Sequence, residues 1–247
     1  MIGTVDIHSH ILPGVDDGAD DLNEALEMLR LAARNGTTDI CLTPHYLANE
    51  NRCSDLSASE LKECFEQFKE SVSRTVPEIN IHLGAEVYSA GTIESVMRNG
   101  EIISLSDSGY VLTEFDFNDS PKRAMEIVRI LQSGGYGVVI AHPERYMFIQ
   151  ENPRLIVPFL ERGALLQINA QSILGVCGPV AQDVALSFLE NALATVVASD
   201  AHSAYYRTPD LSEAYSFVSL NFSNDYAERL FSRNPTAIIR GEKISIL

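Results

Sequence analysis

Most histidines of this sequence, and several of its acidic residues, directly follow short runs of apolar and β-branched residues. The first run leads into Asp6-Ile7-His8-Ser9-His10, and Asp16-Asp17-Gly18 comes shortly afterwards. Later runs lead into His45, Glu86, Glu114, His142, Asp200 and His202. Imidazole and carboxylate together favour Zn, Mn or Fe, whereas an all-oxygen set would favour Mg or Ca. The sequence therefore predicts that these side chains bind metal.

More candidate ligands are present than the roughly four to six that one ion takes, which predicts a cluster of ions. The candidates are His8, His10, Asp17, His45, Glu86, Glu114, His142, Asp200 and His202. Strand geometry places His8 and His10 on the same side, so both imidazoles can reach one ion. Three divalent ions against four carboxylates leave a charge of about +2, which would attract a dianion such as a phosphate monoester. Arg145 and Arg207 follow two of these motifs and can clamp phosphate oxygens.

Each motif alone has a simpler interpretation. Asp16-Asp17-Gly18 could be a turn, His45 a loop residue and Glu86 a solvated strand end. The joint pattern favours a metal cluster, because chance would also scatter these residue types over helices and loops. His82 lies in the middle of a run and is predicted to be a packing or surface residue. The polar segment Tyr46–Ser59 is either a mobile lid over the site or a long loop.

The elements that must position these residues alternate regularly along the chain. Seven runs are predicted strands: Thr4–Ile7, Thr38–Leu42, Ile79–Leu83, Tyr110–Leu112, Gly137–Ile140, Ala164–Ile168 and Thr195–Val197. The predicted helices include Leu22–Arg34, the segment around Leu61–Val72, a helix starting at Ser120-Pro121, Leu155–Arg162, Pro179–Glu190, Leu211–Leu220 and Asn224–Ser232. This alternation predicts an α/β fold, either a βα barrel or an open doubly wound sheet. Because no GxGxxG motif or P-loop follows the first strand, a single barrel-like domain over residues 1–247 is favoured.

Composition excludes several classes of function. The chain of 247 residues has a formal net charge of −16, which argues against binding to nucleic acid or to anionic membrane surfaces. No signal peptide and no membrane-spanning run is expected from the sequence. The four cysteines form no CxxC pair, which favours a reducing cytoplasmic environment over a disulfide framework.

With these residues in view, the chain resembles the PHP superfamily of metal-dependent phosphoesterases. Within it, the chain is similar to the bacterial manganese-dependent protein-tyrosine phosphatases of capsule and exopolysaccharide operons. The likeness runs nearly from end to end, and it rests on DIHSHILPGVDDGA (Asp6–Ala19), TPH (Thr43–His45), GAEVY (Gly84–Tyr88), EF (Glu114–Phe115), AHPERY (Ala141–Tyr146), QINA (Gln167–Ala170) and ASDAH (Ala198–His202). The resemblance implies a distorted (β/α)7 barrel of the TIM type.

The resemblance also implies a division of the ligands among three divalent ions, with Mn²⁺ expected and Fe or Zn open. One ion would bind His8, His10, Glu86 and Asp200, a second Asp17, His45 and His202, and a third Glu86, Glu114 and His142. Arg145 and Arg207 would contact phosphate. A metal ion or His202 would assist the leaving group, and the sequence does not choose between them.

The function implied is hydrolysis of phosphotyrosine by a metal-activated hydroxide. The substrate would be the tyrosine-rich tail of an autophosphorylating bacterial kinase in polysaccharide export. Two alternatives stay open: a small-molecule phosphoesterase such as a histidinol phosphatase, and a non-catalytic metal-binding module. The oligomeric state is left open.

The other route to tyrosine dephosphorylation uses a cysteine nucleophile with an arginine six positions later. In this chain the corresponding positions hold Leu47, Ser59, Glu70 and Asp183. Covalent cysteine catalysis is therefore rejected.

Overall fold

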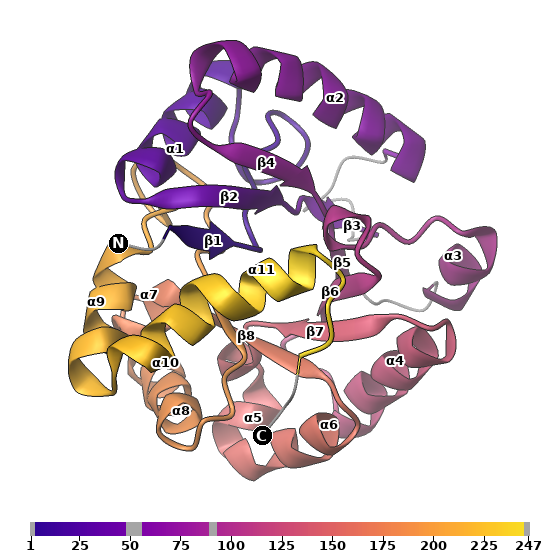
Figure 1. Ribbon diagram of the computed structural model, residues 1–247. Coiled ribbons are helices and arrows are strands. Elements are labelled where there is room, and N and C mark those ends of the chain that lie inside the picture. The colour runs from indigo at the N-terminus through magenta and orange to yellow at the C-terminus, as the bar shows by residue number, and fades with distance from the viewer. Residues whose placement is uncertain (1–2, 48–55, 89–92, 245–247) are drawn as a thin grey trace.

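The computed structural model describes residues 3–47, 56–88 and 93–244 of this α/β chain (Figure 1). In those residues nine strands form two parallel sheets, with the orders β1-β2-β4 and β3-β5-β6-β7-β8-β9. The strands are β1 (Thr4–Asp6), β2 (Thr37–Leu42), β3 (His45–Tyr46), β4 (Asn80–Leu83), β5 (Glu86–Tyr88), β6 (Tyr110–Glu114), β7 (Gly137–Ala141), β8 (Leu165–Asn169) and β9 (Val196–Ala198). The seven predicted strands are all present, and β3 and β5 are additional.

Each of the two additional strands follows another strand after a break of two residues. The segment Thr43-Pro44 separates β2 from β3, and Gly84-Ala85 separates β4 from β5. The segments stay in register across the break, since Gly84 N donates to Leu42 O at 2.9 Å and Glu86 N donates to Pro44 O at 3.1 Å. His45 and Glu86 follow the ends of β2 and β4, as predicted, and each also begins a short strand that the sequence did not indicate.

The backbone after β1 also bonds to the segments on both sides of it. Thr43 N donates to Ser9 O at 2.7 Å, and His10 N donates to Ala201 O at 2.8 Å. Ser9 and Ala201 form a parallel bridge, and Asp200 N donates to His8 O at 2.9 Å. The ends of the first and last strands are thus fixed next to each other.

Helices lie around the strands, and α11 crosses in front of them in Figure 1. They are α1 (Leu22–Arg34), α2 (Ala58–Thr75), α3 (Ile93–Asn99), α4 (Pro121–Ser133), α5 (Met147–Glu151), α6 (Val157–Glu161), α7 (Ala170–Ile173), α8 (Pro179–Glu190), α9 (Ser212–Asn221), α10 (Asn224–Glu228) and α11 (Asn234–Ile239). None of these described helices is both long and apolar enough to cross a bilayer.

Local capping signals explain why several helices begin where the sequence predicts. The Asp21 carboxylate accepts hydrogen bonds from the first turn of α1, and Ser120 caps α4, whose first residue is Pro121. The predicted helix Leu155–Arg162 instead begins with a 3₁₀ turn at Pro153–Ile156 and continues as α6. The predicted helix Asn224–Ser232 changes at Arg229 into a π-helical turn.

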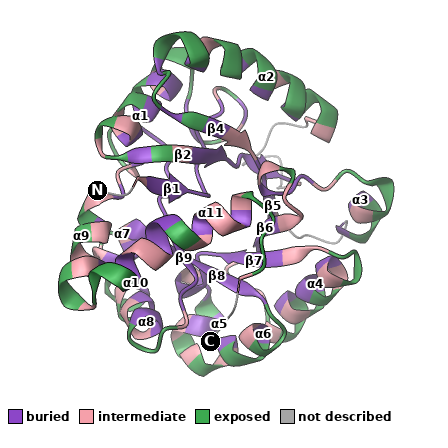
Figure 2. Ribbon diagram, in the orientation of Figure 1, coloured by how far each residue is buried: buried purple, intermediate pink, exposed green. Residues whose placement is uncertain are grey.

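Strands buried on both faces hold the fold together, as the purple strands of Figure 2 show. Along β7, Val138 and Ile140 belong to a large cluster beneath the helices, whereas Val139 and Ala141 belong to a smaller cluster on the other face. The smaller cluster also contains Ile238 of α11. This alternation is that of parallel strands covered on both faces. Packing on both faces keeps the carboxyl ends of the strands in fixed positions.

Candidate metal centre

All nine predicted ligands lie at the carboxyl-terminal side of the strands or in the loops that follow them. His8 and His10 follow β1, Glu114 ends β6, His142 follows β7, and Asp200 and His202 follow β9. Eight of the nine are buried, and Asp17 is the exposed one. Donor atoms within 4.8 Å of one another form three groups: His10, Asp17, His45 and His202; His8, His10 and Asp200; and His45, Glu86 and Glu114. The fold thus brings together residues that are nearly 200 positions apart.

The two imidazoles after β1 face each other, with Nε2 of His8 and Nε2 of His10 only 3.2 Å apart. The amide oxygen of Gln167 accepts from the backbone nitrogen of His142 at 3.3 Å, which identifies this atom as oxygen. The same oxygen is 2.8 Å from His8 Nδ1, so that nitrogen carries the proton. The ring of His10 is oriented in the same way, because its Nδ1 lies 2.7 Å from Oδ2 of Asp16. Burial would lower the pKa of His10, but Asp16 holds it well above its usual value, so without a metal the two Nε2 atoms share a proton, and a cation bound by both nitrogens would replace that proton.

Glu86 lies at the centre of the cluster. Its carboxylate oxygens lie 2.9 Å from His142 Nε2, 3.0 Å from His45 Nδ1 and 3.4 Å from His8 Nε2. Burial would raise the pKa of Glu86, but the facing imidazoles of His8 and His45 hold it well below its usual value. Glu86 is therefore a buried anion in contact with three of the histidines predicted as ligands.

The remaining ligands meet at the outer side of the cluster. The Asp17 carboxylate lies 3.4 Å from Nε2 of both His45 and His202. His142 Nε2 lies 3.8 Å from Glu114, and His45 Nδ1 lies 3.9 Å from the same carboxylate. His45 thus faces Asp17 with one ring nitrogen and Glu86 with the other, whereas the resemblance placed it in one set only.

Two arginines flank Asp200. Arg207 Nη2 lies 2.7 Å from Asp200 Oδ2, and Arg145 Nη1 lies 3.3 Å from the same oxygen. Burial would raise the pKa of Asp200, but His8 and Arg207 hold it well below its usual value. Asp200 and Arg207, like His142, have positive φ angles, of 52°, 49° and 31° respectively. Backbone strain at three neighbouring site positions is typical of functional sites.

Several residues that support the site had no role in the sequence prediction. Asp16 and Gln167 orient His10 and His8, and Asn169 Nδ2 donates to Asp200 Oδ2 at 2.7 Å. Asp6 accepts from the backbone nitrogens of His8 and Ser199, and burial raises its pKa to about 6. The signal for Gln167 and Asn169 was present, because both belong to the quoted QINA motif.

Two other predictions concern residues away from the cluster. His82 lies in β4, where its ring nitrogens are 3.1 Å from Asp39 and from Ser106. Neither His82 nor the predicted ligand His142 belongs to the three groups, but His142 Nε2 lies 2.9 Å from Glu86, whereas the partners of His82 lie away from the cluster. The predicted lid or loop Tyr46–Ser59 has residues 48–55 outside the described residues.

The chain is thus an α/β protein with parallel strands. The buried imidazoles and carboxylates at its strand ends form a site suited to divalent metal. Sequence comparison identifies the family. The chain belongs to the family described as "Capsular polysaccharide synthesis, CpsB/CapC", whose model matches residues 4–240.

Curated relatives match along nearly the whole chain. The tyrosine-protein phosphatase YwqE of Bacillus subtilis is 33% identical over 240 residues, covering 97% of this chain and 93% of the relative. The tyrosine-protein phosphatase CpsB of Streptococcus pneumoniae is 30% identical over 245 residues, covering 97% of this chain and 100% of the relative.

Two solved structures are similar to the chain to different degrees. One from a study of YwqE and CpsB, described as unique metal-dependent tyrosine phosphatases, has a TM-score of 0.90 and 33% identity, covering 98% of this chain and 96% of the other. The phosphotriesterase homology protein of Escherichia coli has a TM-score of 0.64 at 11% identity, covering 96% and 99%. The second similarity concerns the fold alone.

Proposed function

We propose that this protein is a metal-dependent protein-tyrosine phosphatase, which hydrolyses phosphotyrosine to tyrosine and phosphate. The names of the relatives YwqE and CpsB support this activity, and both match the chain over 97% of its length. The observation on this chain that carries the proposal is the 3.2 Å contact between the inner nitrogens of His8 and His10. Two imidazoles held in this way by Gln167 and Asp16 are prepared for a shared cation.

The donor set fits a cluster of three divalent ions. The first would bind His8, His10, Glu86 and Asp200, the second Asp17, His45 and His202, and the third Glu86, Glu114 and His142. Among the described residues, the buried Glu86 Oε2 makes no hydrogen bond of good geometry although His45 Nδ1 lies 3.0 Å away, and a bound cation would satisfy this oxygen. The mixture of imidazole and carboxylate favours Mn²⁺, Fe or Zn, and Mn²⁺ is proposed.

A bound divalent ion would supply Lewis acidity and lower the pKa of a bound water towards neutrality. The chain itself would hold the substrate: Arg145 and Arg207 would contact phosphate oxygens on the Asp200 side of the cluster. Water adds to phosphorus as the bond to the phenolic oxygen breaks, and that oxygen leaves with the electron pair and takes up a proton. Phenol has a pKa of about 10, so its anion leaves with little help from a general acid.

His202 is better suited to metal binding than to proton donation. Its Nδ1 donates to the backbone oxygen of Asp200 at 3.0 Å, which leaves a lone pair on Nε2 facing Asp17. Burial, together with the neighbouring His10, lowers the pKa of His202. A neutral imidazole with Nε2 directed inward is a ligand, and it carries no proton for the leaving group.

For the fold we propose a distorted seven-stranded barrel. In this arrangement β2 with β3, and β4 with β5, each form one interrupted strand. The bridge between Ser9 and Ala201 joins the ends of the first and last strands and supports closure of the ring. The active site would then occupy the carboxyl-terminal mouth, as in other βα barrels.

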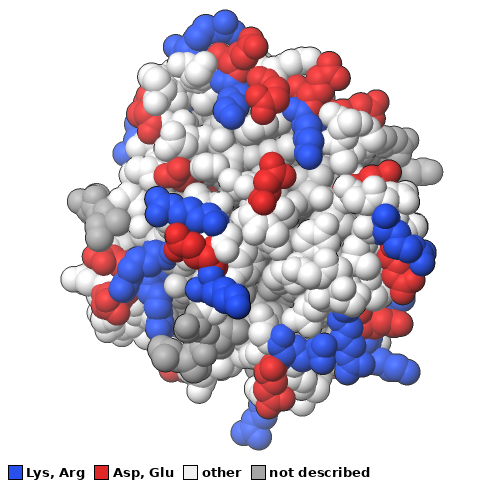
Figure 3. Space-filling view, turned by 45° about the vertical axis from the view of Figure 1, so that its right-hand side comes forward, with Lys and Arg blue, Asp and Glu red and all other residues white. Residues whose placement is uncertain are grey.

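The proposed partner is a phosphotyrosine protein, the tyrosine-rich tail of a bacterial tyrosine kinase in capsule or exopolysaccharide synthesis, and the proposed location is the cytoplasm. Nucleic acid is not expected as a partner. The net charge is −16, and on the face in Figure 3 basic side chains lie beside acidic ones. Such a surface lacks the positive field that nucleic acid requires.

Relative rates on two substrates test the proposed function. The purified protein with Mn²⁺ should hydrolyse a phosphotyrosyl peptide, and a chelator should abolish the activity. Faster turnover of histidinol phosphate than of the peptide would favour a small-molecule phosphoesterase. Protein that binds Mn²⁺ but hydrolyses no phosphoester would favour a non-catalytic module.

A further inference from the structure

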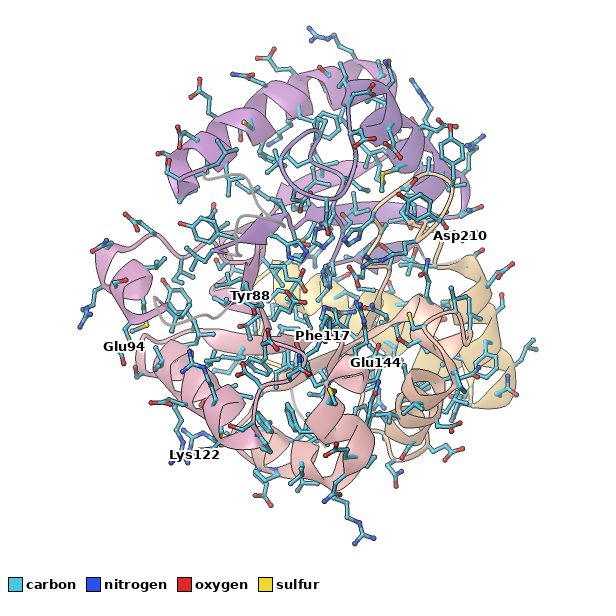
Figure 4. All side chains as sticks on the ribbon, turned by 180° about the vertical axis from the view of Figure 1, so that it is seen from behind. Tyr88, Glu94, Phe117, Lys122, Glu144 and Asp210 are labelled. Atoms are coloured by element: carbon cyan, nitrogen blue, oxygen red, sulfur yellow. The ribbon has the colours of Figure 1, made fainter. Side chains whose placement is uncertain are left out.

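The cavity at the cluster has one apolar wall. It has a volume of about 50 Å³, and nine of the ten described residues that line it are ionisable. The tenth is Phe117, a partly buried residue three positions after the last residue of β6. Seen from behind in Figure 4, Phe117 lies near the centre of the molecule, whereas Glu94 and Lys122 lie at its periphery. A phenyl ring at this position either supports Arg145 or contacts the group to which the phosphate is esterified.

Phe117 lies beside the groups that would bind phosphate. The guanidinium carbon of Arg145 is 4.8 Å from the centre of the Phe117 ring, and the ring of His142 is 5.9 Å away. A group esterified to a phosphate on Arg145 would therefore leave the cluster close to this ring. The proposed substrate carries an aromatic group at that point.

The backbone around Phe117 is held on both sides. Met147 N donates to Phe117 O at 3.0 Å, and Asp119 N donates to Asp116 O at 2.9 Å. The Phe117 ring also packs against Tyr146, with centroids 6.0 Å apart. A ring fixed in this way can contact a substrate without a large loss of side-chain entropy.

We propose that Phe117 determines specificity for aromatic phosphate monoesters by packing against the phenyl ring of the substrate. This rests on the proposed phosphatase function, and it deepens that function by naming the residue that distinguishes aryl from alkyl esters. Aromatic pairs prefer offset or edge-to-face contacts, and such a contact is worth about tenfold in affinity at the upper end. Alkyl esters such as histidinol phosphate would gain less from this wall.

Two phosphonates of different shape provide the test, because neither is hydrolysed. Benzylphosphonate carries a phenyl ring where phosphotyrosine does, and ethylphosphonate has only an alkyl group. Calorimetry on the Mn²⁺-loaded protein should give tighter binding of benzylphosphonate, and Phe117→Ala should weaken it by about tenfold. Binding of ethylphosphonate should fall by less than about twofold. Phe117→Tyr should retain the preference, and Phe222→Ala, at the end of α9, should leave both affinities unchanged.

The result separates recognition of the ring from support of Arg145. If Phe117→Ala lost the same affinity for both phosphonates, Phe117 would only position the guanidinium of Arg145, and the inference would be overturned. Equal affinity of the wild type for both phosphonates would also overturn it. If Phe117→Ala does not fold, Phe117→Leu should show the same selective loss. Turnover of phosphotyrosyl peptide by the wild type tests the proposed function separately. Selective binding without turnover would refute the phosphatase and leave the ring contact intact.

Discussion

Asp16 Oδ2 lies 2.7 Å from His10 Nδ1, and the side chains of both residues are almost completely buried. The same oxygen accepts from the backbone nitrogen of His45 at 2.8 Å, while Asp16 Oδ1 accepts from Gly18 N at 3.1 Å. Burial alone would lower the pKa of His10, but the carboxylate of Asp16 raises it well above its usual value. One carboxylate therefore orients an imidazole, a backbone segment and a turn around the cluster.

Replacement of Asp16 by Asn should weaken metal binding. An amide has one acceptor oxygen, so its NH₂ group would face either His10 and His45 N or Gly18 N, all of which are donors. Loss of such a supporting contact typically costs 10- to 100-fold in metal affinity, and we expect about that loss of Mn²⁺ affinity by calorimetry. Asp20→Asn is the matched control on the exposed part of the same loop. Equal affinity in Asp16→Asn and the wild type would show that Asp16 does not support the cluster.

Asp16 also illustrates what the sequence could and could not predict about the site. Asp16 and Asp17 are adjacent and identical in type, and only Asp17 was predicted as a ligand. In the structure the Asp16 side chain is 1% exposed and bonded to His10, whereas Asp17 is 45% exposed and faces His45 and His202. Strand-end position alone predicted which residues meet. Which carboxylate of the pair turns inward depends on contacts that form only after folding.

The fold shows the same division between local and distant signals. α1 and α8 have the bounds that the sequence predicts, because caps, prolines and apolar spacing are local features. The strands β3 and β5 were missed because two or three residues show no periodicity. They exist because Gly84 N and Glu86 N find partners in Leu42 O and Pro44 O, 42 positions earlier in the chain. Gly84 lies in the break between β4 and β5, and a Cβ there would lie 2.8 Å from the Leu105 side chain, so a larger residue would need that side chain to shift.

Removal of a cluster residue should abolish activity, whereas removal of His82 should not. His8→Ala removes one of the two apposed imidazoles, and Glu86→Ala removes the carboxylate at the centre. Both should lose phosphatase activity to background, with reduced Mn²⁺ content by elemental analysis. His82→Ala should keep most of the activity and most of the Mn²⁺ content, because His82 bonds to Asp39 and Ser106 away from the cluster. Full activity in His8→Ala would contradict the ligand scheme.

Thiol chemistry should be unnecessary for activity. Burial, with the nearby carboxylates of Asp6 and Asp39, raises the pKa of Cys41, so this thiol stays protonated and shielded. Cys177 is the exposed cysteine of the described chain. Cys177→Ser should retain phosphatase activity, and iodoacetamide under native conditions should not inhibit that variant. A loss of more than about tenfold in either experiment would restore cysteine catalysis as a possibility.

Glu144 should make the stability of the metal-free protein depend on pH. Its side chain is fully buried, and Oε1 accepts from Asn169 N at 3.0 Å. Burial raises the pKa of Glu144 from 4.5 to about 7. Because the folded state binds this proton more tightly than the unfolded state, the stability present below pH 4.5 is lost as pH rises through about 7. A shift of this size corresponds to about 3 kcal/mol at most.

Glu144→Gln keeps an oxygen acceptor for Asn169 and cannot ionise. In urea denaturation with EDTA present, its free energy of unfolding should exceed that of the wild type at pH 8, and the difference should shrink towards pH 5. Glu151→Gln, on the exposed end of α5, is the control and should follow the wild type at every pH. If the wild type and Glu144→Gln instead differ by the same amount across this range, Glu144 does not titrate with a raised pKa. The buried carboxyl group would then be ionised in the folded protein at neutral pH.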